Sequence, residues 1–433
     1  MIKQTRREFG SLALGGLAGA TALSGGLISS PAFAQGDIPA GTVIEASNVD
    51  SLLTSTFEGK ALGDMLTEKQ LLMIKNYGLK LTLANSKLWK VDPRYAEWTE
   101  KNRTAVTLDP TTRLVSGWQA GMPFPDIDAA DPQAGLKVIW NFFYGQPIGQ
   151  YINLPRFGFL LVDGNSGLER VQEWRYQRFY LKNRYGDPDN LAVGSGEEFH
   201  RTLLFATSPF DIKGIGTYAI RYDSPKFDDT WAYLRSVRRV RRLSGGSWMD
   251  PIGGTDQLQD DIEIFNAHPT WYPDYKYLGK RWMLSPANTK GGAWNDTQSD
   301  PKLKYPNVDL SSAPYWNPIE NYEPREVHVV ECITPPEHPY SKKIFYIDAQ
   351  TPRPLYGEAY DRAGEFWKYF IFITKDLETI DGTLTQTSSQ GHTIDLQRMH
   401  ATIFVIDSTV EELNRPTPLE AVNLGVLEKE AGT

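Results

Sequence analysis

The chain has 433 residues, a formal net charge of −8 and a single cysteine, Cys332. One cysteine excludes an intramolecular disulfide, and the acidic balance argues against a nucleic-acid partner, because cationic contacts to phosphates dominate such affinity. Aromatic residues make up 12% of the chain, with 12 Trp and 21 Tyr. This is more ring surface than a core requires, and it favours a groove or cavity.

The first 34 residues have the features of a cleaved export signal. The segment "TRREF" (5–9) resembles a twin-arginine signal, and a glycine-rich apolar stretch leads to "AFA" (32–34). The following "GS" (10–11) departs from the usual end of that motif, so the general secretory route is the alternative. Cleavage is predicted after Ala34, which places the protein in the periplasm without a stable membrane anchor. Residues 1–34 carry a net charge of +2, so the remaining chain has −10.

Helix signals lie in the first third of the chain. Thr67 and Gln70 have the spacing of a capping box, and Gly78 is placed to end that helix. Pro93 is predicted to open a second helix, and Asp131-Pro132 a third that runs through "AGLKVIWNFFYG".

From about residue 156 the pattern changes to period two, which indicates strands. Short turns between them predict antiparallel neighbours. The fold class is therefore α+β: a single domain over 35–433, with a large curved antiparallel sheet that forms an incomplete barrel and with helices covering its concave face. The loop-rich segment 285–324 is predicted to be an insertion or lid. The predicted strands are 169–185, 217–223, 326–333, 343–348, 355–361, 365–373 and 394–407.

Catalytic motifs are scarce. No G-x-S-x-G elbow, phosphate-binding loop or dinucleotide fingerprint is present. The six histidines show no i, i+4 pair, and Cys332 is expected to be a core residue on a strand. The sequence therefore predicts no metal, no cofactor and no enzymatic activity.

Aromatic side chains on the predicted strands are the candidates for the wall of an apolar cavity, although each of them also fits a core position. These candidates are Trp174, Tyr176, Phe179, Trp231, Tyr233, Trp282, Phe345, Phe366 and Trp367.

A basic cluster follows the aromatic run "WAYL" (231–234), where a strand is predicted to end and the chain to turn. Its arginines could bind an anionic head group, dock on anionic lipid or pair with acids of the chain itself. We predict that Arg239 or Arg241 pairs with an acid of the following "TDQLQDD" (255–261), as a structural latch beside the cavity mouth. The cluster and its candidate partners are Arg235, Arg238, Arg239, Arg241, Arg242, Asp256, Asp260 and Asp261.

Two stretches resemble periplasmic proteins similar to the outer-membrane lipoprotein-sorting carriers. "DDTWAYLRSVRRVRRLSGG" (228–246) with "GGTDQLQDDIEIF" (253–265) is similar to their Trp-containing, Arg-rich strand and the acidic motif after it, although Arg235 stands where the broader pattern has proline. "YIDAQTPRPLYGEAYDRAGEFWK" (346–368) resembles their late hairpin. "GMPFPDIDAADPQAGLKVIWNF" (121–142) resembles one uncharacterised domain-of-unknown-function family.

The resemblance implies a lipoprotein-localisation-factor-like fold with an apolar cavity under helices. It also implies a periplasmic binding or shuttle protein for lipid or another hydrophobic molecule. The implied partners are that ligand and a permease of the resistance-nodulation-division type or an outer-membrane protein. Two alternatives stay open: an envelope hydrolase of hydrophobic esters using Asp256, Asp261 and His268, and an interaction module that bridges a permease and an outer-membrane partner through 285–324.

Overall fold

The computed structural model describes residues 36–234 and 238–432. The predicted export signal at 1–34 and Arg235 of the basic cluster lie outside these residues. Contacts group Asp37–Thr433 into one unit, which holds all the elements below.

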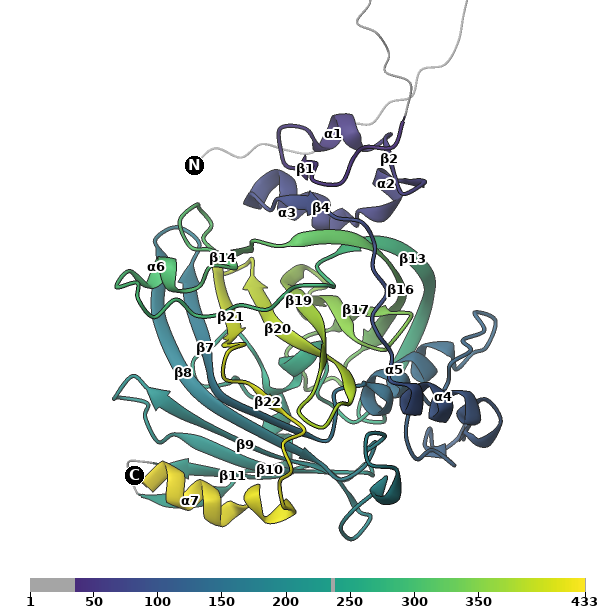
Figure 1. Ribbon diagram of the computed structural model, residues 1–433, viewed down its shortest axis with the longest axis vertical. Coiled ribbons are helices and arrows are strands. Elements are labelled where there is room, and N and C mark those ends of the chain that lie inside the picture. Colours follow the sequence, from purple (N-terminus) through teal and green to yellow (C-terminus); the bar gives the residue numbers. More distant parts are fainter. Residues whose placement is uncertain (1–35, 235–237, 433) are drawn as a thin grey trace, which may run out of the picture. The chain divides into compact units, whose positions relative to one another are not determined.

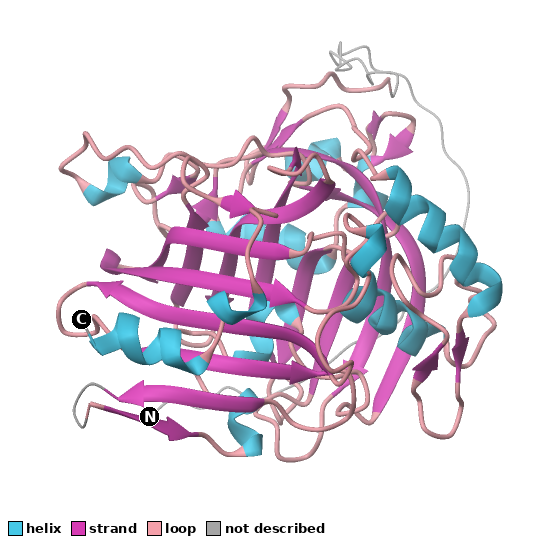
Figure 2. Cartoon of the chain, turned by 60° about the horizontal axis from the view of Figure 1, so that its bottom comes forward, coloured by secondary structure: helices cyan, strands magenta, loops and turns pink. Residues whose placement is uncertain are grey.

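In the described part of the chain, sixteen strands form one strongly curved sheet (Figures 1 and 2). Along the sheet the strand order is β1-β4-β16-β17-β18-β19-β20-β21-β7-β8-β9-β10-β11-β12; β13 also pairs with β16, and β22 with β7. β4 and β16 pair in parallel, and the other strand pairs of the sheet are antiparallel. The strands are β1 (Val43–Ile44), β4 (Leu81–Leu83), β7 (Tyr151–Asp163), β8 (Gly167–Tyr180), β9 (Glu198–Ser208), β10 (Gly216–Tyr222), β11 (Asp229–Leu234), β12 (Arg239–Arg242), β13 (Asp274–Ser285), β16 (Asn321–Ile333), β17 (Lys342–Asp348), β18 (Pro354–Tyr360), β19 (Phe366–Glu378), β20 (Leu384–Asp395), β21 (His400–Ile406) and β22 (Glu412–Leu413).

Short elements complete the chain. Three two-stranded ribbons pair β2 (Thr56–Phe57) with β3 (Lys60–Ala61), β5 (Thr107–Leu108) with β6 (Val115–Ser116), and β14 (Val308–Asp309) with β15 (Asn317–Pro318). No helix in 36–234 or 238–432 is long and apolar enough to cross a membrane. The helices are α1 (Val49–Leu52), α2 (Leu62–Met65), α3 (Glu68–Tyr77), α4 (Pro93–Ala105), α5 (Ala134–Gly145), α6 (Pro301–Lys304), α7 (Leu424–Gly432) and the 3-10 turns η1 (Pro188–Asn190), η2 (Gly245–Met249), η3 (Gln259–Ile264) and η4 (Leu419–Ala421).

The capping signals confirm the predicted helix positions. Thr67 and Gln70 form the predicted capping box of α3, and Gly78 ends that helix in the left-handed region with φ 66°. α4 begins at Pro93, as predicted. α5 begins at Ala134, two residues after Pro132, because Asp131 accepts a hydrogen bond from the Gln133 N–H and holds a turn there.

The central strands bury side chains on both faces, because alternate residues of a strand point to opposite sides. On β19, Tyr369 and Ile371 belong to one apolar cluster, whereas Phe370 and Phe372 belong to another. The first cluster also holds side chains of α3 and of the segment after β13. The second holds α5 and the segment around η3. We call these the outer and the inner face of the sheet.

The last helix covers a third apolar cluster at the β8–β11 end of the sheet. Val422 and Leu427, from the segment that ends in α7, pack against Phe179, Leu203 and Tyr218 of β8, β9 and β10. Because Phe179 and Leu203 alternate with the inward-facing residues of their strands, α7 lies on the opposite side from the inner face.

Two features of the sheet differ from the strands predicted by periodicity. The predicted strand 394–407 is the end of one strand and the whole of the next, since the chain turns between Asp395 and His400. β20 itself reads "LTQTSSQGHTID", a polar sequence without apolar alternation, and yet nearly all of it is buried. The α+β class and the large antiparallel sheet are confirmed.

The loop-rich segment 285–324 packs on the outer face. Trp294, Tyr305 and Trp316 are buried there and belong to the same cluster as the outward side chains of β19 and β21. These rings anchor the segment on the side of the sheet opposite the inner-face helix α5.

Candidate functional site: an apolar pocket with a polar end

The inner face of the sheet contains a pocket of about 120 Å³ with mostly apolar walls. Its wall residues come from β7, β8, β9, β20 and β21, and its cover from the segment 252–263. Four apolar side chains of the lining, Tyr176, Leu204, Ile262 and Phe404, are only half-buried, so the protein itself leaves apolar surface uncovered here. We call this the apolar pocket. It is lined by Ile152, Leu154, Phe157, Phe159, Tyr176, Arg178, Leu204, Ile252, Gln257, Ile262, Glu263, Thr387, Ser388, Phe404 and Ile406.

Strand alternation explains how these side chains converge. The period-two pattern predicted for 169–185 is confirmed in β8, since Tyr176, Arg178 and Tyr180 point to the inner face while Phe179 lies under the α7 segment. On β7 a register shift between Leu154 and Phe157 keeps apolar side chains on both sides of it directed inward.

The cover of the pocket contains an unusual backbone. Glu263 and Ile264 both have positive φ, 51° and 63°, and a β-branched residue in this region is strained. Two contacts hold the conformation. Lys343 Nζ donates to the Ile264 carbonyl at 2.9 Å. The Ile264 side chain packs on Gly357, so closely that a Cβ added to Gly357 would lie 3.0 Å from Ile264 Cγ2. The turn directs the Glu263 carboxylate into the pocket, where it borders the lining residue Arg178.

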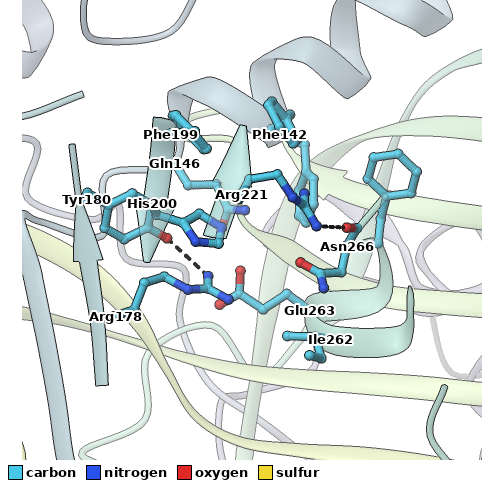
Figure 3. A pocket seen from close by; sticks show the side chains of 12 residues that line it. Phe142, Gln146, Arg178, Tyr180, Phe199, His200, Arg221, Ile262, Glu263 and Asn266 are labelled. Atoms are coloured by element: carbon cyan, nitrogen blue, oxygen red, sulfur yellow. Dashed lines mark hydrogen bonds between the residues drawn. The ribbon is translucent and has the colours of Figure 1, made fainter. Parts of the chain in front are cut away.

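A smaller, polar pocket of about 30 Å³ adjoins the apolar one (Figure 3). The two share Arg178, Ile262 and Glu263 as lining residues. We call it the polar pocket. Its other lining residues come from α5, β8, β9, β10 and the segment after η3: Phe142, Phe143, Gln146, Tyr180, Phe199, His200, Arg221, Phe265 and Asn266.

Three arginines supply the positive charge around the polar pocket. Arg221 makes a two-pronged pair with Asp228, at 2.6 and 2.8 Å. Arg353 is fully buried; it donates to Gln146 and Ser388 and lies 3.5 Å from Glu263. These pairs fix the polar side chains that border the two pockets.

Arg178 differs from Arg221 and Arg353 because, among the described residues, no carboxylate oxygen lies within ion-pair distance of its guanidinium, and its hydrogen-bond partners are neutral. Its guanidinium donates to the Tyr180 hydroxyl at 3.2 Å and to Thr202 Oγ1 at 3.4 Å. Burial lowers the pKa of His200, and the charges of Arg178 and Arg221 add to this effect, so the imidazole between them is neutral. The polar pocket therefore combines donors and positive charge with an adjoining apolar wall.

The structure separates the aromatic residues predicted as cavity wall. Tyr176 lines the apolar pocket, while Trp174, Phe345 and Trp367 pack in the inner-face cluster beside it. The others lie elsewhere: Phe179, Trp231 and Tyr233 under the α7 segment, Phe366 against the outer-face cluster, and Trp282 40% exposed on β13. A ring's presence on a strand does not decide its face, because the central strands bury side chains on both faces.

Sequence reasoning did not single out Arg178, Glu263 or Phe404 as lining residues. Arg178 carried one usable signal, since this charge stands between two tyrosines, Tyr176 and Tyr180, on an alternating face of its strand. Glu263 carried none, because its direction depends on a turn with two positive φ values.

The basic cluster forms a hairpin at the edge of the sheet. β11 pairs with β12, and β12 is the terminal strand in the sheet order, which confirms the predicted change of direction. Arg238, Arg239 and Arg241 are exposed, and Arg242 pairs with Asp229. We call residues 229–234 and 238–242 the basic hairpin. Charged side chains on an edge strand discourage pairing with another sheet.

The predicted latch is wrong, because the acids of 255–261 have other partners. Lys343 Nζ lies 2.9 Å from Asp260 Oδ2 and 2.8 Å from Asp261 Oδ1, and all three side chains are fully buried. Asp256 Oδ2 instead lies 2.6 Å from His400 Nδ1. Over the described residues, no ion pair joins these acids to Arg239 or Arg241. A lysine on β17 satisfies the two buried carboxylates, which leaves the arginines on the surface.

The residues of the hydrolase alternative also have separate partners. Asp256 binds His400, Asp261 accepts from Tyr340, and His268 bonds Thr270. No hydrogen bond joins the three in the part of the chain that the structure describes. Within the same residues, no group of three or more His, Cys, Asp or Glu side chains is placed to hold a metal ion.

Comparison with known proteins places the chain in a family. A family model described as a protein of unknown function, DUF1329, matches residues 43–421. An uncharacterized protein of Pseudomonas aeruginosa is 28% identical over 378 residues, which cover 77% of this chain and 75% of that protein.

Three solved structures are similar to this chain. A putative outer membrane lipoprotein-sorting protein domain from Vibrio parahaemolyticus shares 16% identity, with a TM-score of 0.47 over 69% of this chain and 100% of that chain. A DUF1329 family protein from Desulfovibrio piger shares 15% identity, with a TM-score of 0.47 over 69% of this chain and 100% of that chain. A LolA superfamily protein from Nitrosomonas europaea shares 14% identity, with a TM-score of 0.35 over 65% of this chain and 92% of that chain. The predicted resemblance to an uncharacterised domain family is confirmed, and since the family model spans most of the sequence, the chain belongs to the DUF1329 family of proteins of unknown function.

Proposed function

We propose that this protein is a periplasmic carrier that holds a lipid or another hydrophobic small molecule in the apolar pocket, without covalent chemistry. In this proposal the curved sheet acts as an incomplete barrel, with α5 and the segment 252–263 as the cover of its concave face. The predicted export signal supports the periplasmic location.

The observation that carries the proposal is the uncovered apolar surface inside the fold. Tyr176, Leu204 and Phe404 pack at the edge of the inner-face cluster but are only half-buried, and they line the apolar pocket. Burying a ligand methylene against such a surface contributes about 0.8 kcal/mol, so a chain of several carbons offsets the cost of association. A single polar end would fix the orientation of the ligand.

A pocket-filling variant tests the proposal. We expect the purified protein to bind the apolar fluorophore 1-N-phenylnaphthylamine and to release hydrophobic material on organic extraction. Leu204→Trp should reduce fluorophore affinity at least about tenfold, because the larger ring occupies the apolar pocket. The matched control is Leu303→Trp on α6, where the side chain is 54% exposed. Equal affinity of the two variants, with no extractable ligand, would contradict the proposal.

A further inference from the structure

We propose that the ligand of this site is an amphiphile with a carboxylate head, which binds beside Arg178 in the polar pocket while its hydrocarbon lies in the apolar pocket. The inference rests on the proposed carrier function, because it names the ligand class of the same site.

The burial of Arg178 is the first observation. The side chain is only 7% exposed, and its hydrogen-bond partners Tyr180 and Thr202 are uncharged. Among the described residues, no carboxylate oxygen lies within 4.0 Å of its guanidinium. A buried cation is ordinarily paired with an anion, because removing an isolated charge from water is costly. This guanidinium, which borders both pockets, therefore has capacity for an anionic partner.

The charge balance around the polar pocket supports the same conclusion. Asp228 neutralises Arg221, and Glu263, which lies 3.5 Å from Arg353, is also attracted to Arg178. Three guanidinium groups thus face two carboxylates, and the low pKa of His200 leaves that ring uncharged. The site carries a net positive charge of about one, which a single anionic head would complete.

The size and connection of the two pockets select the class of amphiphile. Arg178 and Glu263 border both, so one molecule can extend from one pocket into the other. The polar pocket is the smaller of the two, at about 30 Å³, which favours a compact head group. The planar guanidinium fork matches a carboxylate with two parallel hydrogen bonds.

The test compares ligands that share one chain and differ in the head. The delipidated protein without residues 1–34 is titrated at pH 8 with dodecanoate, dodecanol and monododecyl phosphate. We expect dodecanoate to bind at least about tenfold more tightly than dodecanol, as a charge-assisted hydrogen bond predicts. Equal binding of acid and alcohol would overturn this inference and leave the carrier function intact. Tighter binding of the phosphate would overturn the choice of carboxylate, and binding of none of the three would overturn both proposals.

Variants assign the effect to Arg178. Arg178→Gln should weaken dodecanoate binding about 10- to 100-fold and change dodecanol binding less than about threefold. The matched control is Arg175→Gln, on the same strand but directed to the other face, where it lies 3.8 Å from Glu430. Loss of dodecanoate binding in both variants would overturn the assignment.

A second variant, which is expected to bind dodecanoate more tightly, tests the inference even if Arg178→Gln fails to fold. Glu263→Gln removes the carboxylate that competes with the ligand for the arginines, so we expect dodecanoate affinity to rise about threefold or more. If the contact between Glu263 and Arg353 were purely structural, removing the carboxylate would not make dodecanoate bind more tightly. An unchanged or weaker affinity would contradict the inference.

Discussion

Phe404 on β21 lies across the backbone of its β20 partner Gly391, at a point where a Cβ on Gly391 would come within 2.1 Å of the Phe404 ring. The same ring lines the apolar pocket. The absence of one side chain on a buried polar strand therefore determines where a wall of the pocket lies.

Gly391→Ala should push the Phe404 ring away from β20 and change the shape of the apolar pocket. We expect a loss of about 1–3 kcal/mol in the free energy of unfolding, typical of overpacking, together with weaker binding of the fluorophore. Urea unfolding and fluorescence titration measure the two effects. Gly246→Ala is the matched control, because its Cβ would meet nothing within 4 Å. Wild-type behaviour of Gly391→Ala would contradict the assigned packing.

Lys343→Met should be among the most destabilising substitutions in the inner-face cluster. It would leave Asp260 and Asp261 buried without their cation, which costs about 3–5 kcal/mol of unfolding free energy. Lys342→Met, at the neighbouring position, removes the half-exposed pair with Glu331 and a contact with the Tyr360 ring, and it should cost about 1 kcal/mol or less. Urea unfolding of both variants checks this difference, and similar midpoints would show that the buried lysine is not essential.

The His400–Asp256 pair predicts a pH dependence of stability. The hydrogen bond to Asp256 raises the pKa of His400 above its usual 6.5; burial opposes this and Glu169 adds to it. A raised folded-state pKa means that the contribution of the pair is complete below pH 6.5 and is lost as the pH rises through the folded-state pKa.

His400→Gln should remove this contribution. The measurement is the free energy of unfolding from pH 5.5 to 8.5 for wild type and variant. Their difference should be largest at the acidic end and shrink as the pH rises. Taking the difference cancels the histidines whose pKa values burial lowers, such as His328 and His392, both to about 4. A difference that does not change with pH would contradict the prediction.

The basic hairpin offers a test of edge protection. Arg239→Thr combined with Arg241→Thr should change the free energy of unfolding by less than about 1 kcal/mol, because both side chains are exposed. Self-association should increase, since the terminal strand β12 then lacks charges that oppose pairing with another sheet. Sedimentation velocity at several concentrations detects the association. A large loss of stability would contradict the exposed, unlatched placement of these two side chains.

Local signals in the sequence predicted the parts of the fold that depend on local chemistry. The capping box of Thr67 and Gln70 and the inward face of β8 belong to this class, because caps and alternation involve residues close in the chain. The strand β20 could not be predicted from alternation, since both of its faces are covered and several of its buried hydroxyls and amides bond to other segments. The ion-pair partner of a buried acid could not be predicted from the sequence either. Asp260 follows five arginines closely in sequence, and yet it pairs with Lys343, 83 positions later.

The pairing of β21 with β7 joins residues 400–406 to residues 157–163. The apolar pocket needs both segments, because its lining residues come from positions as far apart in sequence as Ile152 and Ile406. During synthesis, β7 can pair with β21 only after almost the whole remaining chain has been made. Closing so long a loop is slow. The apolar pocket is therefore complete only once nearly the whole chain has been made, and a ligand bound there would stabilise only the finished chain.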